Sequence, residues 1–206
     1  MHRFGITMRI SHAPGYDEPR DAIAKDWSKY MQSAFPDSQY LFIPNIEKNV
    51  IDFINKWEIN VIILSGGDNI GNYPQRDNTE TILLEYALAN DIPVIGICRG
   101  MQLIHDYFGG KIGAGDESFA NNHRAKNHKV VISNSVFEVN SYHTNIIIEE
   151  TIHKDFYIYA RCTADNSVEG MKSKNILTMM WHPERDKIIS SWNKKNIEEF
   201  LGYHEN

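Results

Sequence analysis

A short apolar run at residues 93–97 changes abruptly into a stretch with helical periodicity at residues 101–108, and the sequence Gly-Ile-Cys-Arg-Gly at residues 96–100 joins the two. A short apolar run bounded by proline and glycine predicts a buried strand. The two glycines allow the strand and the following helix to approach closely, so the backbone between them must turn sharply. We therefore expect a strand–turn–helix unit that holds Cys98 on an exposed, strained turn, the geometry of a nucleophile elbow.

Short apolar runs also alternate with longer amphipathic segments through the rest of the first half of the chain. Strands are expected at residues 4–8, 40–43 and 61–64, and helices at residues 21–35, 46–57 and 79–89. Alternating strands and helices predict a parallel sheet with helices on both faces, in which ligands bind at the carboxyl ends of the strands. Cys98 and the pair Gly66-Gly67 both follow strands and so belong to that edge.

Beyond residue 129 the apolar runs lie closer together. Strands are expected at residues 130–132, 156–160, 168–171 and 176–181, followed by a closing helix at residues 193–203. This spacing predicts a largely antiparallel β layer. The fold expected for the chain is therefore an α/β three-layer sandwich, in which a mostly parallel central sheet is flanked by helices and accompanied by a small antiparallel β layer.

Composition limits the classes of protein that this chain can represent. Its 206 residues, 42% of them hydrophobic, contain no Pro- or Gly-rich linker and indicate one domain over residues 1–206. The net charge of −6, with scattered Lys and Arg, argues against a nucleic-acid partner. No apolar stretch suits a signal peptide or a membrane span, so we expect no membrane partner and a cytoplasmic location. The two cysteines, Cys98 and Cys162, argue against a disulfide framework.

The position of Cys98 favours its ionised form. The first turn of a helix presents backbone N–H groups without intrahelical acceptors, together with the positive end of the helix dipole. Both stabilise a thiolate, which is the nucleophilic form of cysteine. Cys98 is therefore the candidate nucleophile, and we expect it to remain unpaired.

The sequence Trp-His-Pro-Glu at residues 181–184 follows the last predicted strand. Pro183 keeps His182 out of the helical region and withholds a donor from the sheet, so the segment stays extended. His182 and Glu184 then project to the same side. A nucleophilic cysteine requires an imidazole to exchange a proton and a third group to orient that ring. Taken alone, however, His-Pro-Glu is more often a simple turn at the end of a strand.

A third element, Leu-Ser-Gly-Gly-Asp at residues 64–68, follows a predicted buried strand. Successive glycines allow backbone N–H groups to point at a ligand, as an oxyanion hole requires. The N–H of Gly67 and that of Arg99, directly after Cys98, are the candidate donors. By itself a Gly-Gly turn is a weak indication, because such turns are common between strands and helices.

With Gly-Gly, Gly-x-Cys-x-Gly-x-Gln and His-Pro-Glu in this order, the chain resembles the class I glutamine amidotransferases, and within them the stand-alone γ-glutamyl hydrolases. The resemblance spans nearly the whole chain and implies a flavodoxin-like fold. It implies that Cys98 is the nucleophile, that His182 is the base and acid, and that Glu184 orients the ring. The amides of Gly67 and Arg99 become the oxyanion donors. It implies no metal and no organic cofactor.

The resemblance also covers the residues that bind the substrate. In that family, the glutamine after the nucleophile and the backbone of an Asn-Ser-x-His segment hold the α-amino and α-carboxylate groups of the glutamyl substrate. The matching positions here are Gln102, Asn140, Ser141, Tyr142 and His143. Gln102 lies one helical turn beyond Cys98 on the same face, although a solvent-facing side chain is the alternative interpretation.

Parts of the second half of the chain leave alternatives open. The hydrolase branch often continues the Asn-Ser-x-His segment with His and Gln, whereas this chain has Thr144 and Asn145, so the leaving-group side of the pocket is undefined. Glu169 matches the family's Asp-x-x-Val-Glu-Gly strand and is equally consistent with a structural and a functional role. No metal-ligand spacing is present, so three histidines are interpreted as surface or loop residues: His123, His128 and His153.

The expected function is hydrolysis of a γ-glutamyl conjugate of an amine, a small-molecule substrate, without an obligate synthetase partner. One alternative is a glutaminase subunit that passes ammonia to a separate synthetase, and another is a non-catalytic binding module of the same fold. If the leaving amine is phosphorylated, basic residues should line the pocket mouth, although each is equally well explained as surface charge. The candidates are Arg76, Arg99, His123, Arg124 and Arg185.

Overall fold

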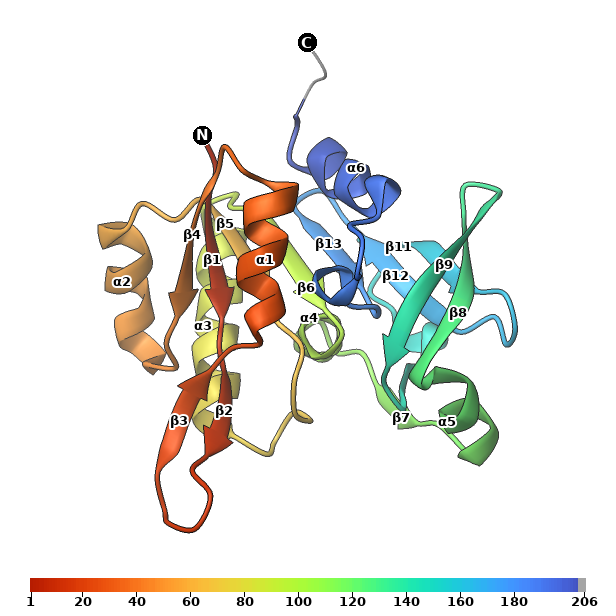
Figure 1. Cartoon of the computed structure of the whole chain (residues 1–206), viewed down its shortest axis with the longest axis horizontal. Helices are drawn as coiled ribbons and strands as arrows, with labels where there is room; N and C mark the ends of the chain where they lie inside the picture. The colour runs from red at the N-terminus through yellow and green to blue at the C-terminus, as the bar shows by residue number, and fades with distance from the viewer. Residues whose placement is uncertain (204–206) are drawn as a thin grey trace.

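Parallel strands form one half of a mixed sheet in the computed structural model, which describes residues 1–203 (Figure 1). In spatial order they are β4 (Gln39–Ile43), β1 (Arg3–Thr7), β5 (Val61–Leu64), β6 (Val94–Ile97) and β13 (Ile176–Met179). The sheet continues through the antiparallel strands β12 (Val168–Lys172), β11 (Tyr157–Cys162), β8 (Arg124–Ile132) and β9 (Ser135–Tyr142). The predicted parallel and antiparallel parts thus join in one nine-stranded sheet. Residues 204–206 of the predicted domain lie outside the described residues.

Helices cover both faces of the parallel half, as the alternation predicted (Figure 1). One face carries α1 (Lys25–Ala34) and α6 (Ser191–Phe200), and the other carries α2 (Val50–Lys56), α3 (Pro74–Ala89) and α4 (Arg99–Tyr107). In β5, Val61 and Ile63 belong to the core under α1. Ile62 and Leu64 point the other way and belong to the core under α2 and α3. Among residues 1–203, no helix is long and apolar enough to cross a membrane.

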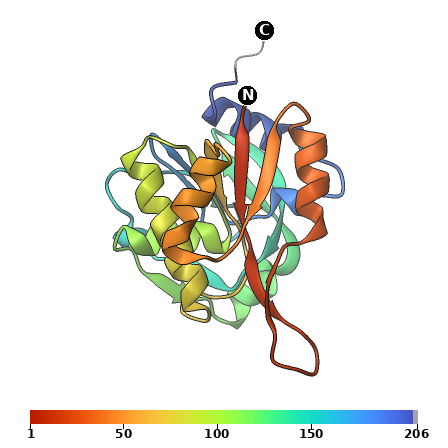
Figure 2. The same ribbon diagram turned by 90° about the vertical axis from the view of Figure 1, so that its left-hand side faces the viewer.

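Short elements complete the fold. The hairpin of β2 (Arg9–His12) and β3 (Pro19–Ala22) projects from the body of the molecule, as Figure 1 and Figure 2 both show. Strand β7 (Ile112–Ala114) pairs with β10 (Asn145–Ile147), and α5 (Glu117–His123) precedes β8. The 3₁₀ turns are η1 (Glu47–Asn49), η2 (Glu149–Thr151) and η3 (Pro183–Arg185).

The helix expected at residues 21–35 was wrong at its start, because α1 begins at Lys25. Asp21 instead lies in β3, where its carboxylate accepts hydrogen bonds from the backbone N–H of Asn45 at 3.1 Å and from the Asn45 side chain at 2.6 Å. This long-range contact and the pairing with β2 override the local helical pattern. Helix α3 also begins earlier than the expected residue 79, with Pro74 in its first turn, a position that suits proline.

The pairing of β6 with β13 determines where the site lies. The two strands are parallel neighbours, with Ile97 opposite Met179, and the Cys98 N–H donates a hydrogen bond to the Met179 carbonyl oxygen at 2.8 Å. Because parallel neighbours end at the same edge of a sheet, Cys98 and the residues that follow β13 meet there. His182 is among those residues.

The strained turn expected at Cys98 is confirmed, but the expected exposure is wrong, because the Cys98 side chain is buried. Cys98 has φ 50° and ψ −103°, a strained conformation for a residue with a side chain. A Cβ atom on Gly100 would lie 2.1 Å from the carbonyl oxygen of Leu64, and one on Gly96 would lie 2.9 Å from Met101 N. The two glycines are therefore required because α4 packs directly on the ends of β5 and β6.

Gly100→Ala is expected to lower the free energy of unfolding by about 1–3 kcal/mol, because the added methyl group must displace the β5 backbone. Urea denaturation measures the difference. The matched control is Tyr107→Ala, an exposed position on the same helix, which should change the free energy of unfolding by less than about 0.5 kcal/mol. Equal stability of Gly100→Ala and the unmodified protein would contradict the close packing of α4 on β5.

Candidate active site

Three predicted side chains from two distant segments of the chain, Cys98 from one and His182 with Glu184 from the other, converge at the carboxyl edge of the parallel strands. Cys98 immediately precedes α4, and His182 immediately precedes η3. His182 Nδ1 lies 2.7 Å from Glu184 Oε1, which leaves the other ring nitrogen for the thiol. All three residues are buried, and the thiol and the imidazole are close enough to shift each other's pKa. The sulfur, the imidazole and the carboxylate are thus electrostatically coupled.

The electrostatics of this group favour an ion pair. Burial by itself would raise the pKa of the Cys98 thiol, but the charge and hydrogen bond of His182 lower that pKa below its ordinary value. Burial would lower the pKa of His182, but the charges of Glu184 and Cys98 raise it to about 9. Both shifts favour the ion pair of thiolate and imidazolium over the neutral pair. The thiolate can attack an electrophile, and the imidazolium can donate a proton.

Asn140 holds the segment that carries His182. Its Oδ1 accepts a hydrogen bond from the His182 N–H at 2.9 Å, and its Nδ2 donates to the His182 carbonyl oxygen at 2.7 Å. Nδ2 also lies 2.8 Å from Asp186 Oδ1. The Asn140 side chain therefore positions the histidine. Asn140 was predicted to bind the substrate, and only its backbone remains available for that contact.

The loop after β5 packs directly against the His182 ring. A Cβ atom on Gly66 would lie 2.5 Å from His182 Cε1, so a larger residue does not fit there. Gly67 has a φ of +150°, which residues with side chains rarely adopt. Arg99, the first residue of α4, has an N–H without an acceptor in its own helix. Arg99 directly follows Cys98, and Gly67 directly follows the glycine that packs on the His182 ring, so both amides predicted as oxyanion donors belong to segments that contact the reactive pair.

A buried ionic network connects the segments of these amides, and its central residue, Glu80 of α3, was not predicted from the sequence. Glu80 Oε1 accepts hydrogen bonds from Thr7 Oγ1 at 2.6 Å and from Arg76 Nε at 3.0 Å. Its other oxygen pairs with Arg99. Arg76 Nη2 in turn donates to the carbonyl oxygens of residues 65 and 66, at 2.9 and 3.1 Å. Arg76 and Glu80 are four residues apart, but the predicted helix began at residue 79, so this i,i+4 signal was missed together with the first turn of α3.

Arg76 and Arg99 therefore do not line a pocket mouth, contrary to the prediction that they are candidates for binding a phosphorylated group. Both are buried, and acidic side chains of α3 pair with both guanidinium groups. Arg124 is exposed and lies opposite Tyr142 in the β8–β9 register. The Arg185 guanidinium carbon lies 4.4 Å from the centre of the Tyr142 ring. Two of the predicted basic residues thus lie at the surface around this tyrosine.

The other predicted substrate-binding residues differ in their exposure and in their hydrogen-bond partners. Gln102 is buried rather than solvent-facing, and its Oε1 accepts a hydrogen bond from Asn145 Nδ2 at 3.0 Å. Ser141 is fully buried, and its Oγ has no hydrogen-bond partner among the described residues. Tyr142 is exposed, and its ring meets that of His182 edge-on at a centroid distance of 5.7 Å.

Two of the three histidines interpreted as surface or loop residues do not fit that interpretation: His123 is buried, and His128 lies in β8 with a side chain only 6% exposed. His123, at the end of α5, is fully buried, so that interpretation and its candidacy for the pocket mouth were both wrong. Its ring centroid lies 4.5 Å from that of His128. His143 Nε2 lies 3.4 Å from Glu169 Oε1, so this predicted substrate-binding residue belongs to the same cluster. His153 is partly exposed in a loop, as expected.

The site is nearly closed. Cys98 is 7% exposed, and the cavity beside His182 and Glu184 has a volume of about 20 Å³. A larger cavity of about 520 Å³ lies at the amino-terminal ends of β1 and β4, on the opposite edge of the sheet, and its lining contains no cysteine or histidine. The thiol therefore has little access to solvent in this structure.

The chain is similar to known proteins over most of its length. Residues 38–201 match the family model described as glutamine amidotransferase class-I. The γ-glutamyl-CDP-amidate hydrolase of Campylobacter jejuni is 36% identical over 204 residues, covering 91% of this chain and 96% of that protein. One subunit of the glutamine-hydrolysing GMP synthase of Pyrococcus furiosus is 30% identical, covering 69% and 74%. A crystal structure from Thermoplasma acidophilum, provisionally described as a subunit of a GMP synthase, shares the fold with a TM-score of 0.68, 20% identity and coverage of 98% and 94%.

Cys98 is expected to react with iodoacetamide faster than Cys162 at neutral pH, because His182 lowers the pKa of Cys98 whereas burial raises that of Cys162. Glu184→Gln should slow the alkylation of Cys98, because without the carboxylate charge the imidazolium is less stable and supports the thiolate less. The difference in the Cys98 rate between Glu184→Gln and the unmodified protein should disappear above a pH of about 9, where His182 loses its proton. Mass spectrometry of the two cysteine peptides across this pH range measures the rates.

The control for this measurement is Glu199→Gln, an exposed position on α6. It removes the same charge far from the thiol and should leave both alkylation rates unchanged. If Cys98 and Cys162 reacted equally fast at neutral pH, the thiolate–imidazolium pair would be excluded.

Proposed function

This chain belongs to the class I glutamine amidotransferase family, and we propose that it is a cysteine hydrolase that cleaves the amide bond of a γ-glutamyl conjugate. The observation that carries the proposal is the buried group of Cys98, His182 and Glu184, in which the thiol pKa is lowered and the imidazole pKa is raised. Such a pair suits acyl transfer, because it supplies both a nucleophile and an acid for the leaving amine.

In the proposed mechanism, Cys98 Sγ attacks the γ-carbonyl carbon of the substrate. The oxyanion that forms accepts hydrogen bonds from the amides of Gly67 and Arg99. His182 donates its proton to the departing amine as the carbon–nitrogen bond breaks, which leaves a γ-glutamyl thioester. The neutral imidazole then removes a proton from water, the resulting hydroxide attacks the thioester, and glutamate is released with the thiolate and imidazolium restored. Glu184 keeps the ring oriented throughout.

The glutamyl part of the substrate is proposed to bind beside Gln102 and along the backbone of residues 140–143. Gln102 is buried one helical turn beyond Cys98, and its carbonyl oxygen is held by Asn145, so its amide nitrogen is left to face a ligand. Within residues 1–203, that nitrogen has only the weakly accepting sulfur of Met180 nearby, at 3.7 Å.

The narrower proposal is that the substrate is γ-glutamyl-CDP-amidate, which would give glutamate and cytidine diphosphoramidate. It is supported by the 36% identity to the C. jejuni hydrolase, which extends over nearly the full length of both chains. Arg124 and Arg185 also lie near Tyr142, which contacts His182, and cations there suit the phosphates of a leaving group. The leaving group would then extend over the surface around this tyrosine.

A glutaminase subunit that delivers ammonia to a separate synthetase is the second candidate, because the chain is also 30% identical to one subunit of a GMP synthase. The two candidates differ in one property that is easily measured. A hydrolase releases glutamate as an independent protein, whereas a subunit of this kind depends on its synthetase.

The purified chain alone is therefore expected to release glutamate from γ-glutamyl-CDP-amidate, with a higher kcat/KM than from γ-glutamyl anilide or glutamine. An enzyme-coupled glutamate assay measures all three substrates, and Cys98→Ser, which keeps the size of the side chain, should lower kcat by at least about 10³-fold. Equal kcat/KM for the anilide and the nucleotide would reject the nucleotide leaving group. Absence of glutamate release without a partner would favour the glutaminase subunit.

Gly67→Ala tests the oxyanion donor. Its Cβ would lie 2.3 Å from Arg76 Nη1, and the φ of +150° disfavours alanine, so the amide should move away from the oxyanion and kcat should fall at least about tenfold. Gly71→Ala is the matched control, because Gly71 also has a positive φ, +90°, but has open space around it. A folded Gly67→Ala protein with unchanged kcat would show that the donor lies elsewhere.

A further inference from the structure

A second cluster of titratable side chains lies on the antiparallel side of the sheet, and the proposed hydrolysis does not explain it. It consists of His123 at the end of α5, His143 after β9 and Glu169 on β12, all buried. His123 Nδ1 and His143 Nε2 are 3.3 Å apart. Glu169 Oε1 lies 3.5 Å from the first nitrogen and 3.4 Å from the second. Three segments that are distant in the chain thus direct one atom each at a common point.

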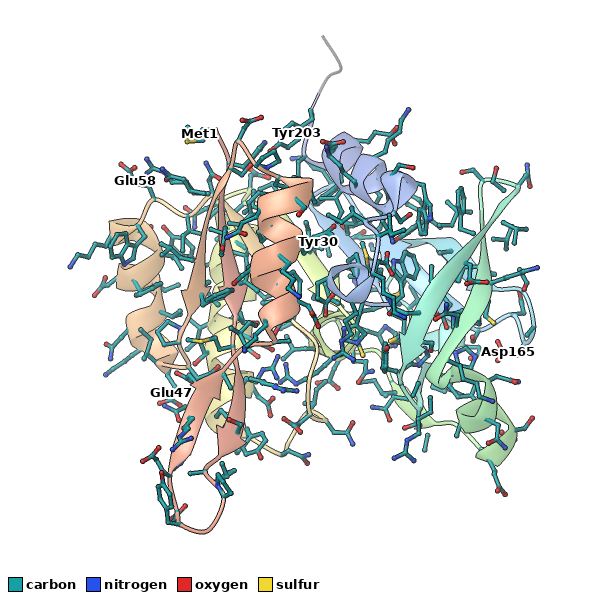
Figure 3. All side chains as sticks on the ribbon, in the orientation of Figure 1. Met1, Tyr30, Glu47, Glu58, Asp165 and Tyr203 are labelled. Atoms are coloured by element: carbon teal, nitrogen blue, oxygen red, sulfur yellow. The ribbon has the colours of Figure 1, made fainter. Side chains whose placement is uncertain are left out.

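In each ring one nitrogen faces Glu169 and is called the inner nitrogen. The other, called the outer nitrogen, already has a hydrogen-bond partner. His123 Nε2 donates to Asp165 Oδ2 at 2.7 Å, and His143 Nδ1 donates to the carbonyl oxygen of Asn145 at 3.0 Å. Asp165 is labelled in Figure 3, on the side of the molecule where α5 packs. Because a carboxylate and a carbonyl oxygen only accept, these outer nitrogens carry the ring protons. In neutral rings the two inner nitrogens are therefore acceptors.

Three acceptors consequently face one another: the two inner nitrogens and the carboxylate oxygen of Glu169. Without a cation between them they repel, and burial makes that repulsion costly. A single proton can satisfy only one nitrogen–oxygen pair, whereas a metal ion is bound by all three atoms at once. Burial would lower the pKa of His143, but the hydrogen bond and the charge of Glu169 raise it, so a proton can join this one pair. A metal ion would bind the His123 nitrogen as well.

The separations fit a tetrahedral metal ion. Bonds of about 2.1 Å from zinc to nitrogen or oxygen give a tetrahedron with edges of about 3.4 Å. The three measured separations, 3.3, 3.5 and 3.4 Å, are close to this edge length. The carboxylate and carbonyl partners of the outer nitrogens are also the usual partners of metal-binding histidines, because they fix the tautomer and the ring orientation.

Polar atoms beside the cluster that lack partners also support a bound metal ion. Both nitrogens of His128 and Oε2 of Glu169 are buried and have no hydrogen-bond partner among the described residues. His128 Nε2 lies 3.4 Å from that Glu169 oxygen. Buried polar groups without partners are rare in folded proteins, so three of them in one place indicate a ligand. His128 is the nearest side chain that could complete the coordination.

We infer that His123 Nδ1, His143 Nε2 and Glu169 Oε1 bind one zinc ion. Two imidazoles and one carboxylate suit zinc or a similar transition metal, whereas magnesium and calcium prefer oxygen ligands alone. The inference departs from the expectation, drawn from the sequence, that the chain holds no metal. The ion ties α5 and β12 to His143, at the end of the segment whose Asn140 positions His182. Its role is to hold that segment in place, and the hydrolysis itself requires no metal.

The test is zinc binding by the full chain with Cys98→Ser, which removes the catalytic thiol as a competing zinc ligand. After treatment with a chelator and removal of the chelator, the protein is titrated with Zn²⁺ alone in a calorimeter, and bound metal is counted by mass spectrometry. One zinc per chain is expected. Co²⁺ alone should give the visible absorption bands of a four- or five-coordinate site. None of these measurements depends on hydrolytic activity, so their failure can be distinguished from failure of the proposed function.

Two variants in the same background locate the ion. Glu169→Gln keeps the shape of the side chain but removes the charged ligand, and it should abolish stoichiometric zinc binding and the cobalt bands. Asp165→Asn, at a partly exposed position, should weaken zinc binding about 10- to 100-fold by removing the partner of His123. His153→Asn is the matched control, a partly exposed histidine outside the cluster, and should bind zinc normally. Circular dichroism verifies that each variant is folded.

The inference is overturned if the folded Cys98→Ser chain binds no zinc, because the cluster then holds protons only. It is also overturned if Glu169→Gln and Asp165→Asn bind zinc as tightly as their parent, because the ion then lies elsewhere. Zinc that binds the unmodified chain and is lost with Cys98→Ser would belong to the catalytic pair and would contradict the inference equally.

Discussion

The parallel pairing of β6 with β13 is the contact on which the rest of the site depends. Each strand carries one half of the reactive pair just beyond its carboxyl end, Cys98 after β6 and His182 after β13. Neighbouring parallel strands end together, so two segments far apart in the chain are brought to one edge. The antiparallel strands contribute from the other side, because Asn140 of β9 forms hydrogen bonds with both the N–H and the carbonyl oxygen of His182. The mixed sheet therefore builds the site from both of its halves.

Burial then gives these groups their chemical character. A thiol and an imidazole in water would both be largely neutral near pH 7, whereas here mutual attraction outweighs the cost of burying their charges. The same balance holds in the network of Glu80 with Arg76 and Arg99, where a carboxylate is buried between two guanidinium groups. That network connects the loop after β5 to the first turn of α4. The proposed oxyanion donors are thus held in place before a substrate arrives, which is what electrostatic stabilisation of a transition state requires.

Local features of the fold were predicted well, and long-range ones were not. Strand β5 has the predicted bounds, and the elbow at Cys98 has the strained backbone that its flanking glycines indicated. The helix expected from residue 21 begins four residues later, because Asp21 bonds to Asn45 across the fold. Helix α5 was not predicted, and His123 was interpreted as a surface residue because nothing adjacent in sequence shows that Phe119 stacks on its ring and that α5 packs on β8.

Short-range geometry could be derived from the order of the residues alone: the turn at Cys98 and the alternation that requires a parallel sheet. These follow from steric limits on neighbouring residues and from the period of the apolar positions. The extended His-Pro-Glu segment was wrong, because Pro183–Arg185 form a 3₁₀ turn. Which charged and polar groups meet, such as Glu80 with two arginines, or His123 with His143 and Glu169, depends on the packed fold. A buried polar group is costly unless it is paired, and its partner becomes defined only when distant segments have packed around it.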